Sequence, residues 1–426
     1  MAIQTKPVEG MDRPYCSLIR YNGPLLLASL LLQAVPAHTQ SLMAGAGPNR
    51  HVNIYNTDLA VLESGEVRKD LPCTVTPNKP ALGFDLRFHS GYEVTIPLRE
   101  LAGGENMLSI IFRVESQDRR DQPIYFSQRV RVPAIEDDAK GEAYLQGAFD
   151  LGEGQYHVDW LMRDRAERVC SSYWDSEAAL AAKDRPMNLT VAAGSIQAAN
   201  IEQFKDEPPV QRVDNEPPLN VKVLVNFAPQ NSLSATLQPV DTSALVSILR
   251  TIVRDPHIGN FSLVAFNMQE QKVLYRQDRA DAINFPALGA AVNTLNLGTV
   301  ALKQLTDKHG DTEFFTDLVR KEVVTGPQDH PDAVIFAGPK VLLDENVPPE
   351  TLKEAGDVNF PVFYMNYNLN PQAVPWKDAI GRTVKFFRGT EYTISRPRDL
   401  WFAVSEMVSR IVKSRNGRPS SSISSQ

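Results

Sequence analysis

The chain has 426 residues, of which 42% are hydrophobic and 22% are charged, a balance typical of a soluble protein with more than one folded domain. It carries 44 Lys and Arg against 51 Asp and Glu, so its formal net charge is -7. Such a chain lacks the positive field that attracts nucleic acids and anionic lipid surfaces. We therefore expect no nucleic-acid partner.

The first 37 residues have the pattern of a secretory signal peptide. Arg13 and Arg20 precede an apolar run over residues 23–35, which is shorter than the roughly 20 residues of a comfortable membrane-spanning helix. Small residues at Val35 and Ala37 predict cleavage after Ala37, with an uncleaved membrane anchor as the alternative. We expect a secreted or periplasmic protein with no stable membrane span after cleavage.

Cleavage at this point would leave two cysteines, Cys73 and Cys170. In an oxidising compartment, an even pair is more often a disulfide than two free thiols. A bridge requires their Cα atoms to lie within about 6 Å of each other, which a sequence does not reveal. The sequence is therefore compatible with a disulfide between Cys73 and Cys170 and with two free thiols.

Residues 38–197 are predicted to form an antiparallel β-sandwich. Short runs rich in Val, Ile, Phe and Tyr alternate with turn residues, and some apolar side chains recur at every second position. Tyr156, which follows Gly152 at the start of a late run, resembles the tyrosine corner of immunoglobulin-like domains, although an ordinary Tyr at the start of a strand fits equally well. We expect strands at residues 51–62, 83–98, 106–116, 123–133, 155–163 and 167–174.

Residues 198–220 are predicted to be an acidic, proline-rich linker. The pairs Pro208-Pro209 and Pro217-Pro218, each preceded by Glu, favour extended backbone over a packed core. At the other end of the chain, residues 414–426 are polar and rich in Ser, which predicts a frayed tail.

Residues 221–413 alternate between strand and helix patterns. This alternation predicts a mostly parallel sheet covered by helices on both faces. Asp241 is placed to cap the first of these helices. We expect strands at residues 221–226, 261–268, 272–276, 333–337, 362–367 and 391–394, and helices at residues 242–254, 297–324, 378–387 and 398–412.

The order of these elements resembles the von Willebrand factor A (VWA) domain, and in particular the VWA-related domains of secreted bacterial proteins. The residues that carry the resemblance are Val223–Asn226 as the first strand, Asn296–Thr299 at the start of a helix, and Val334–Gly338 as the central strand and its turn. The resemblance covers under half of the chain. It implies a doubly wound sheet of VWA type.

In that family a divalent cation is held by an Asp-x-Ser-x-Ser motif, by a Thr before a helix and by an Asp at the end of the central strand. The matching positions here are Asn226, Ala228, Gln230, Thr299 and Ala337. Thr299 alone keeps the family's residue type, and a helix N-cap explains it as well. Because hard cations require charged oxygen ligands, we expect no metal at this degenerate site.

Other chemical signatures are missing from the sequence. It contains neither the Gly-x-x-x-x-Gly-Lys-Ser/Thr nor the Gly-x-Gly-x-x-Gly phosphate-binding loop, and no Gly-x-Ser-x-Gly motif. Its seven His are dispersed and lack the spacing of zinc ligands. We therefore expect no cofactor and assign no catalytic residue. Tyr364 and Tyr367 fall at the end of a predicted parallel strand, where open α/β sheets place ligands. They are our candidates for a partner surface.

These patterns favour a non-catalytic protein that binds an unknown protein partner through a metal-independent VWA-like module. Two alternatives remain. The first is an enzyme with an unrecognised active site at the domain interface, and the second is a structural component of the cell envelope or of an assembly.

Overall fold

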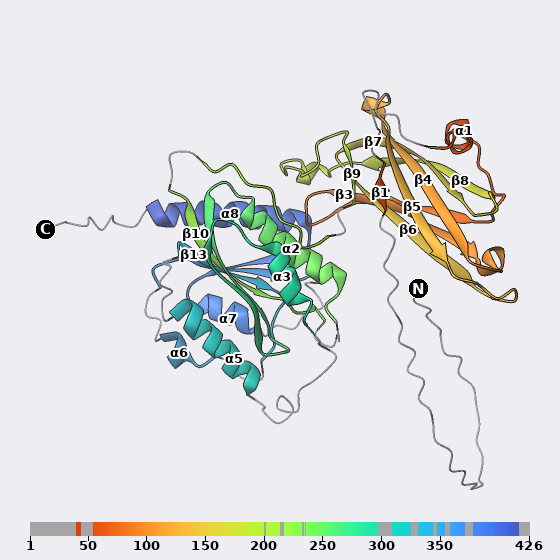
Figure 1. Ribbon diagram of the computed structural model, residues 1–426. Helices are drawn as coiled ribbons and strands as arrows, with labels where there is room; N and C mark the ends of the chain where they lie inside the picture. The colour runs from red at the N-terminus through yellow and green to blue at the C-terminus, as the bar shows by residue number, and fades with distance from the viewer. Residues whose placement is uncertain are drawn as a thin grey trace, which may run out of the picture. The chain divides into compact units, whose positions relative to one another are not determined.

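The computed structural model describes residues 40–43, 54–199, 202–213, 217–231, 234, 236–295, 297, 309–324, 331–343, 347–353, 358–370 and 378–416. The predicted signal peptide over residues 1–37 and the predicted site residue Thr299 lie outside these ranges. Among the described residues, no helix is long and apolar enough to span a membrane. The chain forms two compact units (Figure 1). The described parts of residues 1–79, 90–149 and 155–176 make the first unit, and those of residues 80–89, 150–154 and 177–426 make the second.

Two sheets form a β-sandwich. Most of its strands belong to the first unit. The five-stranded sheet has the order β1 (Ser41–Leu42), β5 (Ile124–Val132), β4 (Asn106–Ser116), β7 (Gly154–Arg163) and β8 (Val169–Ala178). The four-stranded sheet has the order β2 (Thr74–Leu82), β3 (Phe88–Pro97), β6 (Glu142–Leu151) and β9 (Ile196–Ala198). The pairs β1/β5, β4/β5 and β4/β7 are antiparallel. Short 3-10 turns lie at Leu98–Leu101, Gln117–Arg119 and Ala182–Asp184.

Aromatic side chains fill the space between the two sheets. Tyr92 of β3 lies 5.4 Å from Phe112 and 5.3 Å from Trp160, measured between ring centroids. Phe149 of β6 lies 5.7 Å from Phe112. All four rings are fully buried. Strand β4, which carries Phe112, is buried at every second position from Leu108 onward, and this packing explains the period of two in its sequence.

The prediction of a strand at residues 51–62 is wrong, because part of this segment forms helix α1 (Asn56–Ser64). Its buried residues Asp58, Val61 and Leu62 follow helical spacing, and Val61 and Leu62 pack against Leu161 and Val169 of the outer sheet face. Strands β2 and β6 were not predicted, because prolines interrupt β2 and a glycine interrupts β6.

The second unit contains a six-stranded mixed sheet. Its order is β12 (Lys272–Ala280), β11 (Ile258–Asn267), β10 (Leu219–Asn226), β13 (Ala333–Gly338), β14 (Val362–Tyr367) and β15 (Thr390–Ile394). Every neighbouring pair is parallel except β11 and β12, which form an antiparallel hairpin. All residues of β10, β13 and β14 are buried, as expected for strands covered on both faces.

Helices cover both faces of this sheet (Figure 1). On one face, α2 (Pro239–Val253), α3 (Phe285–Val292) and α8 (Pro397–Asn416) enclose one apolar core. On the other face, α5 (Gly310–Val319), α6 (Pro349–Lys353) and α7 (Ala379–Phe386) enclose a second core. A π-helical turn, Arg320–Val324, directly follows α5. Helix α8 extends to Asn416, so the first three residues of the predicted tail are helical instead of frayed.

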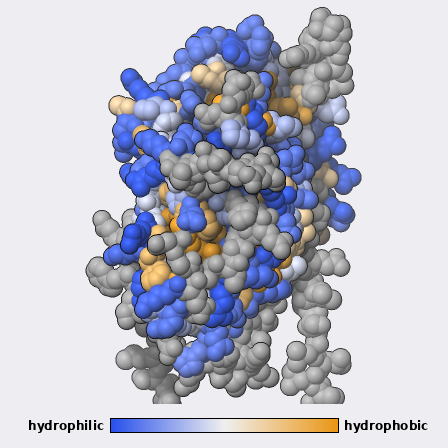
Figure 2. Space-filling view, turned by 90° about the vertical axis from the view of Figure 1, so that its left-hand side faces the viewer, coloured by the Kyte–Doolittle hydropathy of each residue, from blue (hydrophilic) through white to orange (hydrophobic). Residues whose placement is uncertain are grey.

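The surface of the described residues is mostly hydrophilic on the face shown in Figure 2, where apolar residues gather in a smaller area. This distribution agrees with the charged-residue content of the chain.

Candidate functional site

The carboxyl ends of the parallel strands carry amide side chains. Strand β10 ends at Asn226 and β11 at Asn267, while Asn366 is the penultimate residue of β14. All three side chains are fully buried. Since the carboxyl edge of an open α/β sheet is where ligands bind, this amide edge is the candidate site.

Asn226, the last residue of β10, is held by backbone groups. Its Oδ1 accepts a hydrogen bond from the Met268 amide at 3.2 Å, and its carbonyl accepts from the Ala228 amide at 3.0 Å. Gly338, the last residue of β13, has a φ of +143° and lies so close that an added Cβ would sit 2.8 Å from the Asn226 Cβ. A glycine is therefore required beside Asn226.

The other predicted positions lie at the same edge. Ala337 is fully buried and pairs in register with Val225, the neighbour of Asn226. Gln230 donates from Nε2 to Asn368 Oδ1 at 2.9 Å, which links the loop after β10 to the loop after β14. The structure thus brings Asn226, Ala228, Gln230 and Ala337 to one edge of the sheet.

Two carboxylates near this edge are engaged in helix capping, and a third, that of Glu391, accepts a hydrogen bond from Asn366 Nδ2 at 2.7 Å. Asp241 accepts from the Gln238 amide at 3.3 Å in the first turn of α2, where Gln238 is the N-cap and Asp241 the third helical residue. Asp378 is the N-cap of α7 and accepts from the amides of Val341 and Ile380 at 3.1 and 3.2 Å. Burial, followed by the nearby Glu391 charge, raises the pKa of Asp378 to about 6.

Within the part of the chain that the structure describes, no three His, Cys, Asp or Glu side chains are grouped to hold a metal ion. Besides these carboxylates, the edge carries the neutral amide groups of Asn226, Asn267 and Asn366, each of which forms a hydrogen bond within the chain. Neutral amide groups of this kind are poor competitors with water for Mg²⁺.

The prediction that Tyr364 and Tyr367 form an exposed partner surface is wrong. Both side chains are fully buried. The Tyr364 hydroxyl donates to the Gly338 carbonyl at 3.3 Å, while Tyr367 packs in the core against α2 and α8, with the Phe84 ring edge-on to it. Burial and the nearby Asp241 carboxylate raise the pKa of Tyr367. The prediction failed because helices cover both faces of β14, so that side chains pointing to either face of the sheet are buried.

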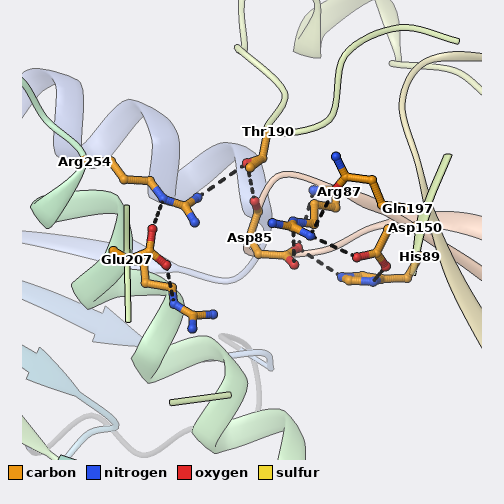
Figure 3. Close-up of polar contacts among 9 residues, drawn as sticks. Asp85, Arg87, His89, Asp150, Thr190, Gln197, Glu207 and Arg254 are labelled. Carbon is orange, nitrogen blue, oxygen red and sulfur yellow. Dashed lines mark hydrogen bonds and ion pairs between the residues drawn. The ribbon is translucent and has the colours of Figure 1, made fainter. Parts of the chain in front are cut away.

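A polar cluster that the sequence did not predict lies elsewhere in the second unit (Figure 3). The fully buried Asp150 accepts from His89 Nδ1 at 2.8 Å and from Arg87 at 3.2 Å. The other ring nitrogen of His89 lies 3.0 Å from Asp85. The carboxylates of Asp150 and Asp85 raise the pKa of His89 to about 10, so its imidazolium keeps both protons at neutral pH.

In the same view, Glu207 forms ion pairs with two arginines. One is Arg250 within α2, and the other is Arg254 at the C-cap of α2. The Glu207 carboxylate lies 2.8 Å from Arg250 and 2.7 Å from Arg254. The sequence signal for such clusters is a charged residue inside an apolar run, as in Phe88-His89 and Phe149-Asp150, since a buried charge requires a partner.

The structure also joins Cys73 to Cys170 by a disulfide with a Cα to Cα distance of 6.3 Å. This bond lies within the first unit and connects the residue before β2 to β8.

No protein-family model and no curated protein matches the chain. Among solved structures, the minor pilin PilB from Streptococcus sanguinis is similar over 75% of this chain and 90% of that chain, with 8% identity and a TM-score of 0.26. A glycosyl hydrolase family 2 member from Bacteroides cellulosilyticus shares 11% identity over 75% of this chain, with a TM-score of 0.18. A Bacteroides uniformis β-glucuronidase shares 9% identity over 74%, also with a TM-score of 0.18. The matches span 37% and 38% of the two hydrolases, and at these TM-scores none of the three similarities carries an argument about function.

Proposed function

We propose that this chain is a secreted or periplasmic, non-catalytic protein that binds a protein partner at the carboxyl edge of its mixed sheet without a metal ion. The observation that supports this most directly is the amide edge itself. Asn226 and Ala337 stand where the family's metal site has carboxylates, and the neighbouring carboxylates of Asp241 and Asp378 cap helices. A recognition site built this way depends on hydrogen bonds and shape.

The VWA-like character of the second unit is part of this proposal. The antiparallel β11/β12 hairpin at one side of the mixed sheet and the helices on both of its faces support it. The immunoglobulin-like character of the sandwich belongs to the proposal as well, and the face-to-face packing of its two sheets supports it.

The secreted or periplasmic location is supported by the Cys73–Cys170 disulfide. Disulfides form and persist in oxidising compartments and are rare in the cytosol. The predicted signal peptide, which lies outside the described residues, points the same way.

The enzyme alternative gains little from the unpredicted cluster. His89 has both ring nitrogens bound to carboxylates and a pKa of about 10, whereas a general base needs a pKa near the operating pH. A groove of about 510 Å³ in the second unit has neither His89 nor Asp150 among its lining residues. The enzyme and the assembly component therefore stay as secondary hypotheses.

Isothermal titration of the full chain with Mg²⁺, Mn²⁺ and Ca²⁺ tests the metal-independent part of the proposal. We expect no binding heat up to about 1 mM ion, because neutral amides do not compensate for the lost hydration of a divalent cation. Micromolar binding to the wild-type chain would contradict the proposal.

Cross-linking to the extracytoplasmic proteins of the source organism tests the binding role. We expect the same partner in EDTA and in Mg²⁺, and a loss of about tenfold or more in capture by Gln230→Lys, which places a charge at the amide edge. The matched control is Gln211→Lys, an exposed glutamine of the predicted linker. Recovery that requires Mg²⁺, or equal recovery by both variants, would refute binding at this edge.

A further inference from the structure

The turn between β2 and β3 places an aromatic side chain at the end of β14. The Gly83 amide donates to the Arg87 carbonyl at 2.8 Å, and the Leu86 amide donates to the Gly83 carbonyl at 3.0 Å, so residues 83–87 form a tight turn. Phe84 projects from this turn. Its ring meets the ring of Tyr367, the last residue of β14, edge-on with centroids 6.3 Å apart.

Phe84 belongs to the second unit, together with Tyr367, and packs against the core that α2, α3 and α8 enclose. It remains partly buried, whereas Tyr367 beneath it is fully buried. The turn therefore covers part of the carboxyl edge that the proposed function assigns to a partner.

Several polar contacts hold the turn in place, among them the ion pair of Arg87 with the buried Asp150 at 3.2 Å (Figure 3). Thr190 donates from Oγ1 to the Asp85 carbonyl at 2.6 Å and from its amide to the Leu86 carbonyl at 2.9 Å, and Arg254 reaches Thr190 Oγ1 at 3.5 Å. Leu86 has a φ of +60°, which costs energy for a residue with a branched side chain. The strained turn persists because the Phe84 ring packs against Tyr367.

From these contacts we infer that the carboxyl end of β14 is a receptor site for an aromatic side chain carried on a tight turn, and that Phe84 occupies it in cis. This inference rests on the proposed function and names its regulation. A protein partner that uses the site presents a Phe or Tyr on a similar turn and must displace Phe84. Because the tethered Phe84 acts at a millimolar effective concentration, a free ligand competes poorly with it.

The test uses a fluorescent, end-to-end cyclised peptide with the sequence of residues 81–90, titrated by anisotropy against the full-length chain. We expect Phe84→Ala to bind this peptide at least about tenfold more tightly than the wild type, because its tethered competitor is gone. Tyr144→Ala, which removes an aromatic ring that is 70% exposed, is the matched control and should behave like the wild type. A peptide with Ala in place of Phe84 should not bind to any of the three chains.

Equal binding of the peptide to Phe84→Ala and the wild type, or no binding to a folded Phe84→Ala chain, overturns the inference. If Phe84→Ala does not fold, Phe84→Leu provides the second variant, which keeps an apolar side chain without the ring. Hydrogen exchange then supplies an independent reading: the peptide should protect the amides of residues 363–370 in the variant, and unchanged exchange there counts against the site. A negative result in this test does not change the outcome of the metal titration or of the partner capture, since both experiments use chains that keep Phe84.

Discussion

Lys222 is a charged residue in a strand that is buried at every position. Its ammonium group lies 2.8 Å from the Glu322 carboxylate, whose other oxygen lies 2.7 Å from Arg276. The side chains of Lys222 and Glu322 are 8% and 2% exposed. The cationic partners lower the pKa of Glu322 against the effect of burial, so the carboxylate stays ionised at neutral pH.

Glu322→Gln should therefore destabilise the second unit strongly. The substitution leaves Lys222 as a buried charge without a carboxylate, which typically costs about 3–5 kcal/mol. Guanidinium unfolding monitored by circular dichroism measures this loss. Glu313→Gln, at an exposed position in the first turn of α5, is the matched control and should change the free energy of unfolding by about 1 kcal/mol or less. Equal stability of the two variants would show that the ion pairs contribute little.

At the scale of the element, helix α7 begins with a capping carboxyl group whose pKa is raised. Asp378 Oδ1 accepts from the amides of Val341 and Ile380, and thereby joins the segment after β13 to the first turn of α7. Its side chain is almost fully buried. Burial and the Glu391 charge raise its pKa from 3.8 to about 6.

Because the pKa of Asp378 is higher in the folded than in the unfolded chain, its stabilising effect is complete below about pH 4 and is lost as the pH rises through 6. In the wild type, we expect the free energy of unfolding to fall by roughly 2–3 kcal/mol between pH 4 and pH 7 because Asp378 ionises. Asp378→Asn keeps the capping oxygen but does not ionise, so this decrease should be absent from the variant. Unfolding titrations of the wild type and the variant across this range measure the difference. Glu391→Gln should reduce the same loss by part of that amount, and parallel pH profiles for all three chains would exclude this role of Asp378.

At the scale of the whole molecule, two units with separate cores are built by different means. The first unit packs aromatic side chains between sheets and is cross-linked by Cys73–Cys170, which are 97 residues apart in the sequence. The second unit relies on two apolar cores on either side of one sheet. A cross-link over so many residues restricts the unfolded chain more than a short one does.

Replacement of both cysteines by serine should destabilise the first unit by about 2–5 kcal/mol. Tryptophan fluorescence, to which the buried Trp160 of the sandwich core contributes together with the other three Trp of the chain, can follow unfolding in guanidinium. Reduction of the wild type with a phosphine should give the same decrease as the double substitution. If reduction leaves the midpoint unchanged, the bridge does not contribute to stability.

The sequence predicted those features that depend on local periodicity. The strand expected at residues 106–116 coincides with β4, and the strands at residues 333–337 and 362–367 match β13 and β14 closely. Runs of this kind are recognisable because one or both faces of the strand are buried along its length. Helix α1 was missed, because a single apolar turn at Val61 and Leu62 resembles a short strand run.

By itself, the sequence also determined which residue types end the strands of the mixed sheet, since Asn226 and Ala337 need no coordinates to be read. Only the tertiary structure decided which side chains lie together: Phe84 against Tyr367, Glu322 between Lys222 and Arg276, and His89 between Asp85 and Asp150. Tyr364 and Tyr367 changed from candidate surface residues to core residues for the same reason. Contacts between residues distant in sequence depend on how loops close and layers pack, and local patterns of hydrophobicity carry no information about either.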